Sequence, residues 1–271
     1  MKFRNPASSK IFVILAYRRT GSNYLMKVLD SFANVDFFGE VYHQKTVWIP
    51  TAKKRKYVEW LDNTHNQKVN IGYKAFEDSE LVKLNHDRPD YFLDFLALTS
   101  DRPYVGFKIF PEHLTWQQLS TILLDRHICK LVLKRNLLNV YISDKILDRT
   151  NSSQTKDTSK IKINIDCLNF RTWYFETQSY YSRLELCLRN HNQKYSEIFY
   201  EQIHSYSCDE EKSAFIQQWL QQNNIQIEGR SIAVNYPKRQ DKRTKILAKI
   251  ENSEELENYL QQHNLQHLLF N

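Results

Sequence analysis

The stretch "IFVILAYRRTGSNYLMKVL", residues 11–29, decides the fold class of this chain. Residues 11–16 form a continuous apolar run, which is typical of a strand buried on both faces of a parallel sheet. Beyond two arginines and a short polar segment, apolar residues recur at helical spacing, which predicts a helix over residues 22–32. A buried strand that leads directly into a helix is the repeating unit of parallel α/β proteins.

The rest of the chain continues this alternation. Further strands are predicted at 35–38, 104–110, 128–134 and within "SEIFYEQI" (196–203), and helices at 51–60, 88–98, 114–125, from 137, at 167–188, at 213–222 and at the C-terminus. This pattern predicts an α/β fold, a single P-loop-like domain over residues 1–271 with a central, mainly parallel sheet of about five strands flanked by helices. The polar segment 150–164 predicts a mobile surface loop, and 236–271 a basic loop plus a C-terminal helix.

Composition limits the classes of partner. The chain has 271 residues, of which 41% are hydrophobic, and its formal charge is 38 − 31 = +7, which favours an acidic partner. The four cysteines form no CxxC pair, so we expect reduced thiols in a cytoplasmic protein. No apolar run approaches the roughly 20 residues of a membrane span, so no membrane partner is expected. His263 and His267 lack a third ligand of obvious spacing, and no metal site is predicted.

The junction at residues 19–23 has the chemistry of an anion site. Ligands of parallel α/β sheets bind beyond the carboxyl ends of the strands, where the next helix presents unpaired N–H groups. Gly21 lets the backbone curve around an anion, and Arg19 supplies a charged fork suited to phosphate or sulfate. The alternative is an ordinary strand-to-helix turn with Thr20 or Ser22 as the helix cap.

A second arginine follows a later predicted strand. In "LVLKRNLLNVYIS", residues 131–143, Arg135 comes directly after the strand and Ser143 lies eight residues further on, in the next helix. A permanent cation at a strand end and a neutral donor from the neighbouring helix suit a phosphate group. The alternatives are a basic strand end with an incidental serine, and a helix capped by Asn136.

These two motifs resemble those of the sulfotransferase family that uses 3′-phosphoadenosine 5′-phosphosulfate (PAPS). "RTGSNYL", residues 19–25, is similar to the 5′-phosphosulfate loop of the bacterial and carbohydrate-type branch, R-[ST]-G-[ST], and Arg135 with Ser143 resembles the 3′-phosphate motif. The resemblance implies PAPS as co-substrate and no metal, with Arg19 at the bridging region and 5′-phosphate. It also implies donor contacts from Thr20, Gly21, Ser22, Asn23 and Tyr24. Arg18 departs from the family, which often has proline there.

Two weaker matches lie nearer the C-terminus. "FYEQI", residues 199–203, resembles the family's late strand ending in Tyr-Glu, which we interpret as structural. "YPKRQDKRTKILAKI", residues 236–250, resembles the basic loop that closes over the 3′-phosphate. Lys238 and Arg239 are the candidates in this loop, and Arg243 is a possible replacement.

The segment "FFGEVYH", residues 37–43, holds two candidates for the general base that sulfuryl transfer needs. Glu40 aligns with the glutamate base of the carbohydrate-like branch, and His43 is the second candidate because small-molecule sulfotransferases use histidine. The alternative for Glu40 is an ion pair with one of the arginines. The resemblance also assigns Lys108, in "GFKIF", to orienting donor or acceptor. Tyr42 and Trp48 are expected to touch the acceptor.

The sequence therefore predicts a PAPS-dependent sulfotransferase. Its acceptor would be a hydroxyl or amine of a saccharide or of a small natural product such as an alkaloid. One alternative is a P-loop-fold small-molecule kinase, disfavoured because GxxxxGK[ST] is absent. Another is a basic nucleic-acid-binding module, disfavoured because the arginines sit at predicted strand ends rather than among aromatics on one surface. No nucleic-acid partner is expected, and the acceptor and the oligomeric state stay open.

Overall fold

The computed structural model describes residues 9–70, 79–150, 157–229, 243 and 245–270. Five strands form one sheet in the order β2-β3-β1-β4-β5, with every neighbouring pair parallel. The strands are β1 (Lys10–Ala16), β2 (Val35–Phe37), β3 (Tyr104–Ile109), β4 (Ile128–Lys134) and β5 (Tyr195–Phe199). The predicted α/β, P-loop-like fold with about five strands is thus confirmed.

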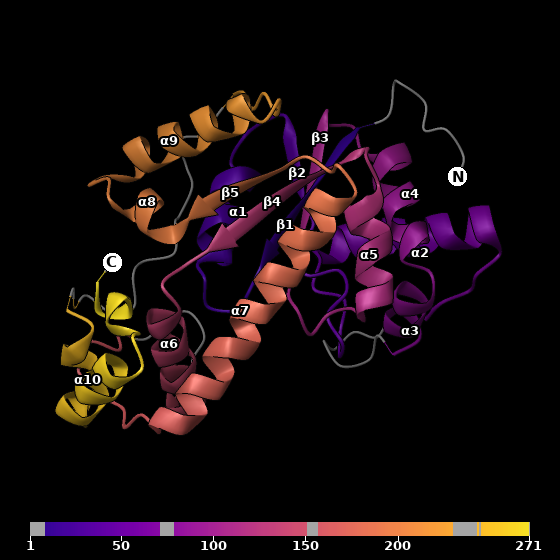
Figure 1. The fold of residues 1–271 in the computed structure, drawn as a ribbon. Coiled ribbons are helices and arrows are strands. Elements are labelled where there is room, and N and C mark those ends of the chain that lie inside the picture. Colours follow the sequence, from indigo (N-terminus) through magenta and orange to yellow (C-terminus); the bar gives the residue numbers. More distant parts are fainter. Residues whose placement is uncertain (1–8, 71–78, 151–156, 230–242, 244, 271) are drawn as a thin grey trace.

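Helices connect and cover the strands (Figure 1). They are α1 (Ser22–Asp30), α2 (Thr51–His65), α3 (Ser79–Asp87), α4 (Pro89–Thr99), α5 (Trp116–Leu124), α6 (Leu137–Thr150), α7 (Cys167–Asn190), α8 (Tyr200–His204), α9 (Asp209–Gln222) and α10 (Ser253–Gln262). Two short 3₁₀ helices, Leu247–Lys249 and Gln266–Leu269, flank α10. None of the helices in the described ranges combines the length and the apolar character that crossing a membrane takes.

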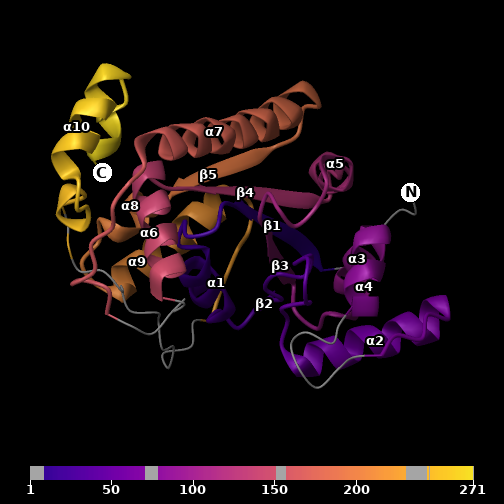
Figure 2. The ribbon, with the colours of Figure 1, turned by 90° about the horizontal axis from the view of Figure 1, so that it is seen from below.

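The central strand β1 explains the layered core. All of its residues after Lys10 are buried, and successive side chains of a strand point to opposite faces. Ile11, Val13 and Leu15 join one core cluster with α4, α5 and α7, whereas Phe12, Ile14 and Ala16 join another with α1 and α9. Figure 2 shows α5 and α7 on one side of the sheet and α1 on the other.

A third core cluster lies beyond the carboxyl ends of the strands, between α6, the first turns of α7, and α10. A backbone bridge between Ile163 and Ile250 joins the segment before α7 to the segment before α10. Arg243 donates to the carbonyl oxygens of Thr158, Ile161 and Ala248, so it holds this region together. Residues 151–156 of the expected surface loop lie outside the described residues. The expectation is wrong for Thr158, which is buried.

One local prediction is also wrong, and one helix was missed. The strand expected through residue 203 ends at Phe199, and Tyr200 begins the short helix α8. The Glu201 side chain accepts a hydrogen bond from the backbone N–H of Asn136, so contacts with the start of α6 fix this chain reversal. Helix α3 was not predicted, because its mostly polar sequence buries only Leu81 and Asn85.

Candidate active site

The turn between β1 and α1 presents an open helix N-terminus. Gly21 is the N-cap residue of α1 in the left-handed conformation (φ 92°), and no side chain of the described chain caps the helix there. The first turn carries no acidic residue. Thr20 is fully buried and donates its hydroxyl to the Tyr17 carbonyl at 2.6 Å, so its side chain shapes the turn. The N–H groups of the first turn therefore form a site that favours an anion.

Glycine is required at position 21 by its neighbour as well as by its backbone. A Cβ built on Gly21 would lie 2.3 Å from Cδ2 of Tyr200. The same ring also contacts Arg135, whose guanidinium carbon lies 4.1 Å from the ring centroid. The Tyr200 ring therefore links the first turn to the second arginine, a role that the interpretation of "FYEQI" as structural did not include.

The two predicted motifs meet directly. Arg135 donates from Nη1 to the carbonyl oxygen of Arg19 at 2.8 Å, and Arg19 donates from Nε to Oγ of Ser143 at 3.0 Å. Asn136 does cap α6, because its Oδ1 accepts from the Asn139 N–H at 3.1 Å. Asn136 therefore caps the helix while Arg135 contacts Arg19, so a helix cap and a phosphate motif, which the sequence offered as alternatives, do not exclude each other.

This meeting point is electropositive. Arg18 pairs with Asp144 at 2.6 Å, and Arg19 and Arg135 bring two further guanidinium groups. Three arginines against two carboxylates, Asp144 and the neighbouring Glu112, leave a formal charge of 3 − 2 = +1. Burial lowers the pKa of Arg19, the Arg135 and Arg18 charges lower it further, and Asp144 opposes them. A bound anion would relieve this repulsion.

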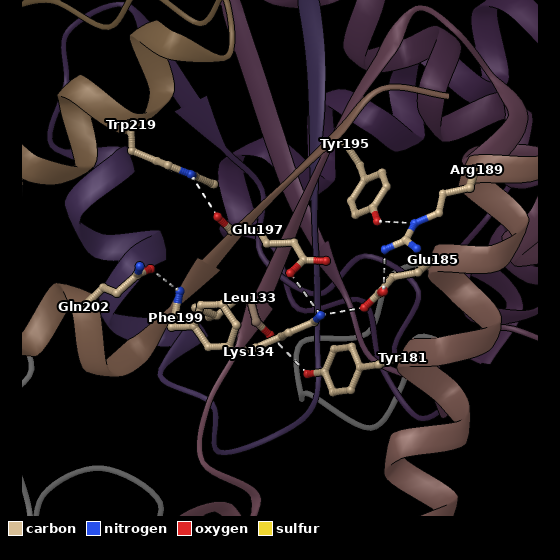
Figure 3. Close-up of polar contacts among 10 residues, drawn as sticks. All are labelled: Leu133, Lys134, Tyr181, Glu185, Arg189, Tyr195, Glu197, Phe199, Gln202 and Trp219. Carbon is tan, nitrogen blue, oxygen red and sulfur yellow. Dashed lines mark hydrogen bonds and ion pairs between the residues drawn. The ribbon is translucent and has the colours of Figure 1, made fainter. Parts of the chain in front are cut away.

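The strand end that carries Arg135 is firmly anchored (Figure 3). Lys134 lies between the carboxylates of Glu185 on α7 and Glu197 on β5. Tyr181 of α7 donates to the Leu133 carbonyl and accepts from the Tyr17 N–H, both at 3.0 Å. One tyrosine hydroxyl therefore ties the carboxyl end of β4 to that of β1, which fixes the two arginine motifs relative to each other.

Glu40 occupies a tight turn after β2. Gly39 precedes it with φ 82°, and a Cβ at Gly39 would lie 2.5 Å from the Trp48 carbonyl oxygen. The backbones of Glu40 and Trp48 exchange two hydrogen bonds of 3.1 Å. These contacts hold the Glu40 side chain at the same sheet edge as the arginine motifs, with 21% of it exposed.

Lys108 joins Glu40 to the first turn. Its ammonium nitrogen lies 2.9 Å from Oε1 of Glu40 and also donates to Oδ1 of Asn23 in α1. Burial lowers the pKa of Lys108, whereas the charge of Glu40 raises it. The alternative considered for Glu40, an ion pair with an arginine, is therefore wrong in its partner, because the buried lysine takes that place.

His113 completes the surroundings of Glu40 and was missed from the sequence. Its Nδ1 accepts a hydrogen bond from the Phe110 N–H at 3.3 Å, which assigns the proton to Nε2, 3.6 Å from Oε2 of Glu40. Lys108 and His113 thus face different oxygens of one carboxylate. The available signal was a histidine five residues after Lys108, in the loop that follows the strand.

The buried His113 predicts a pH-dependent stability. Burial, with the neighbouring His43 and Lys108, lowers the pKa of His113 from 6.5 to about 3. Between these values the unfolded chain binds a proton that the folded chain does not, so stability falls as the pH drops below 6.5. From pH 7 to pH 5 the wild type should lose about 2 kcal/mol more than His113→Gln, measured by urea unfolding. Equal losses in both proteins would contradict the assignment of a neutral His113.

The other residues predicted on the acceptor side lie in different environments. Tyr42 is fully buried, donates to the Pro89 carbonyl at 2.9 Å and packs against Phe107, so its expected acceptor contact is wrong. Trp48 is 50% exposed, and its ring lies 6.2 Å from that of His43. Burial lowers the pKa of His43, which keeps this imidazole neutral near pH 7.

Two donor-side residues also carry corrections. Tyr24 is buried and donates its hydroxyl to Asp209 of α9 at 3.0 Å, so its side chain serves packing rather than the expected donor contact. Ser22 is buried as well, which leaves mainly its backbone for a ligand. Lys238 and Arg239 lie outside the described residues. Arg243, the possible replacement, is committed to backbone carbonyls.

The chemistry at this edge rests on the cations and on Glu40. Across the described ranges there is no group of three or more His, Cys, Asp or Glu side chains placed to hold a metal ion. In comparisons with known proteins, neither the models of protein families nor the curated protein sequences gave a match to this chain.

Proposed function

We propose that this protein is a PAPS-dependent sulfotransferase. The observation that carries the proposal is the convergence of Arg19, Arg135 and Ser143, from two separate strand-to-helix junctions, on one uncapped helix N-terminus. A ligand with one negative group would need only one such junction. Two linked junctions suit a nucleotide with negative groups at both its 3′ and 5′ positions.

The residues fit the donor in two parts. The first turn of α1 and Arg19 would hold the 5′-phosphosulfate, because backbone N–H groups and a guanidinium fork are the usual partners of such an anion. Arg135 and Ser143 would hold the 3′-phosphate. Tyr200, stacked on Arg135, keeps that guanidinium in place.

The donor supplies a sulfuryl group, whose bond to the bridging oxygen breaks as a new S–O or S–N bond forms to the acceptor. The bridging oxygen departs with the bond electrons on adenosine 3′,5′-bisphosphate. Like phosphoryl transfer, this reaction spreads negative charge over the peripheral and leaving oxygens. Arg19 and the α1 N-terminus stabilise that charge, and Lys108 adds a second cation beside Asn23.

Glu40 takes the proton that the acceptor hydroxyl or amine loses. The backbone bridge to Trp48 positions the carboxylate, Lys108 fixes its orientation through Oε1, and Nε2 of His113 lies 3.6 Å from the other oxygen. A base held in this way contributes by being placed at hydrogen-bond distance from the reacting group. Lys108 contacts both Glu40 and Asn23, so it couples the acceptor side of the site to the donor side.

The 3′-phosphate assignment is tested by comparing two nucleotides. Adenosine 3′,5′-bisphosphate and adenosine 5′-monophosphate differ only in the group that Arg135 would bind. We expect Arg135→Ala to lower the affinity for the bisphosphate by roughly 10- to 100-fold, because a charge-assisted hydrogen bond is lost. The affinity for the monophosphate should fall by less than about threefold. Isothermal titration calorimetry measures both affinities.

Arg126→Ala is the matched control for this experiment. Arg126 is exposed and precedes β4 at the opposite, amino-terminal edge of the sheet. The Arg126→Ala substitution removes the same charge and should leave the affinities for both nucleotides unchanged. If Arg135→Ala lost the same affinity for both nucleotides, Arg135 would only support the turn through the Arg19 carbonyl. That result would contradict the assignment of Arg135 to the 3′-phosphate.

A further inference from the structure

A cavity of about 650 Å³ opens between α5 and α7, apart from the arginine constellation. Its walls include Leu114, Trp116, Leu119, Phe175, Tyr180 and Arg183. This volume is within the usual range for small-molecule sites, which are mostly apolar with a few placed polar groups.

The cavity borders the surroundings of Glu40. Pro111 and Leu114 line it, and the two residues between them in the chain are Glu112 and His113. His113 lies 3.6 Å from the Glu40 carboxylate. Burial raises the pKa of Tyr180, with further contributions from Tyr181 and Glu112, and burial also raises the pKa of Glu112, with a smaller contribution from Glu40. The β3–α5 loop therefore lies between the cavity and the candidate base.

The lining indicates what kind of molecule fits. Its two charged side chains, Glu176 and Arg183, have opposite signs, and the Arg183 guanidinium stacks on the Trp116 ring at 4.0 Å. The remaining walls are largely aromatic or aliphatic. The buried Tyr180 hydroxyl has no hydrogen-bond partner among the described residues. Such a site offers a neutral apolar ring system good contacts.

We infer that this cavity binds the acceptor, and that the acceptor is a neutral compound with an apolar ring body that carries its hydroxyl or amine toward Glu40. The inference rests on the proposed function and narrows its substrate class. A saccharide exposes hydroxyl groups around every ring, and each one buried here without a partner would cost binding free energy. The aromatic and aliphatic walls therefore select against saccharides.

The test uses 2-naphthol as a neutral aromatic alcohol and sucrose as a neutral saccharide, with binding followed by ligand-observed NMR titration. Ser179→Trp places an indole at a lining position on the exposed side of α7, where it should fill the cavity without disturbing the core. Ser182→Trp makes the same change three residues further along α7, at an exposed position outside the lining. Stabilisation by adenosine 3′,5′-bisphosphate is measured on all three proteins as a separate readout.

We expect 2-naphthol to bind wild type and Ser182→Trp equally and Ser179→Trp at least about tenfold more weakly, with no binding of sucrose. The bisphosphate should stabilise all three proteins. Tighter binding of sucrose than of 2-naphthol, or equal binding of 2-naphthol by the two variants, would overturn the inference about the cavity. Binding of 2-naphthol at the cavity without any stabilisation by the bisphosphate would instead overturn the proposed function and the acceptor role with it.

Discussion

Replacing Arg19 by alanine should lower the rate of sulfuryl transfer by about 1000-fold, the usual cost of removing a preorganised donor from a developing negative charge. Arg19 lies directly before the α1 N-terminus, its Nε is oriented by Ser143, and its backbone carbonyl is held by Arg135. Its guanidinium is therefore fixed before the donor binds, which is the condition for a large electrostatic effect.

Transfer to water allows this prediction to be measured without knowing the acceptor. The observable is the release of radiolabelled sulfate from labelled PAPS under single-turnover conditions. Arg126→Ala, with the same loss of charge at the far edge of the sheet, should keep the wild-type rate. An Arg19→Ala protein that releases sulfate within a few-fold of wild type would remove Arg19 from the reaction.

The Glu40→Gln substitution should lower the same rate by roughly 100- to 10,000-fold while donor binding is retained, because an amide cannot accept the proton. Glutamine keeps the size of the side chain, and its carbonyl oxygen can still accept from Lys108. The expected signature is therefore a loss of turnover with an unchanged affinity for adenosine 3′,5′-bisphosphate. Glu59→Gln, an exposed position on α2, is the matched control.

His43 is the alternative base, and one further variant separates the two. The lowered pKa of His43 leaves it neutral and able to accept a proton near pH 7. An active Glu40→Gln protein together with an inactive His43→Gln protein would transfer the role to His43. An inactive Glu40→Gln protein with an active His43→Gln protein agrees with the present assignment.

The fold was predictable because its main determinants are local. The apolar run of β1 and the helical spacing of α1 are visible within about twenty residues, and the same alternation recurs for β3, α5, β4 and α6. Position 200 shows the limit of this approach. "SEIFYEQI" has the composition of a strand, but the helix α8 begins at Tyr200, whose ring stacks on Arg135 and lies against Gly21. Those contacts join segments that are distant in the sequence, so they produce no periodic pattern of residues from which they could be predicted.

In the candidate site, only the contact between the two arginine motifs was predictable from such local signals. Arg19 and Arg135 are recognisable by their places after strands, and Ser143 by its spacing of eight residues from Arg135. The structure brings the three into contact. His113 acquires its position only because the β3–α5 loop folds back toward Glu40. Tyr42 was assigned to the acceptor from its nearness to Glu40 in the sequence, although the tight turn at Gly39 sends it into the core.

The most direct test of the central claim is the stabilisation of the protein by adenosine 3′,5′-bisphosphate, compared with ATP and with duplex DNA. At 100 times its dissociation constant, a ligand that binds only the folded state adds about 2.7 kcal/mol to the free energy of unfolding. We predict this gain for the bisphosphate in wild type, a clearly smaller gain at the same concentration in Arg135→Ala, and little effect of ATP or DNA. Stabilisation by ATP or DNA with none by the bisphosphate would contradict the account.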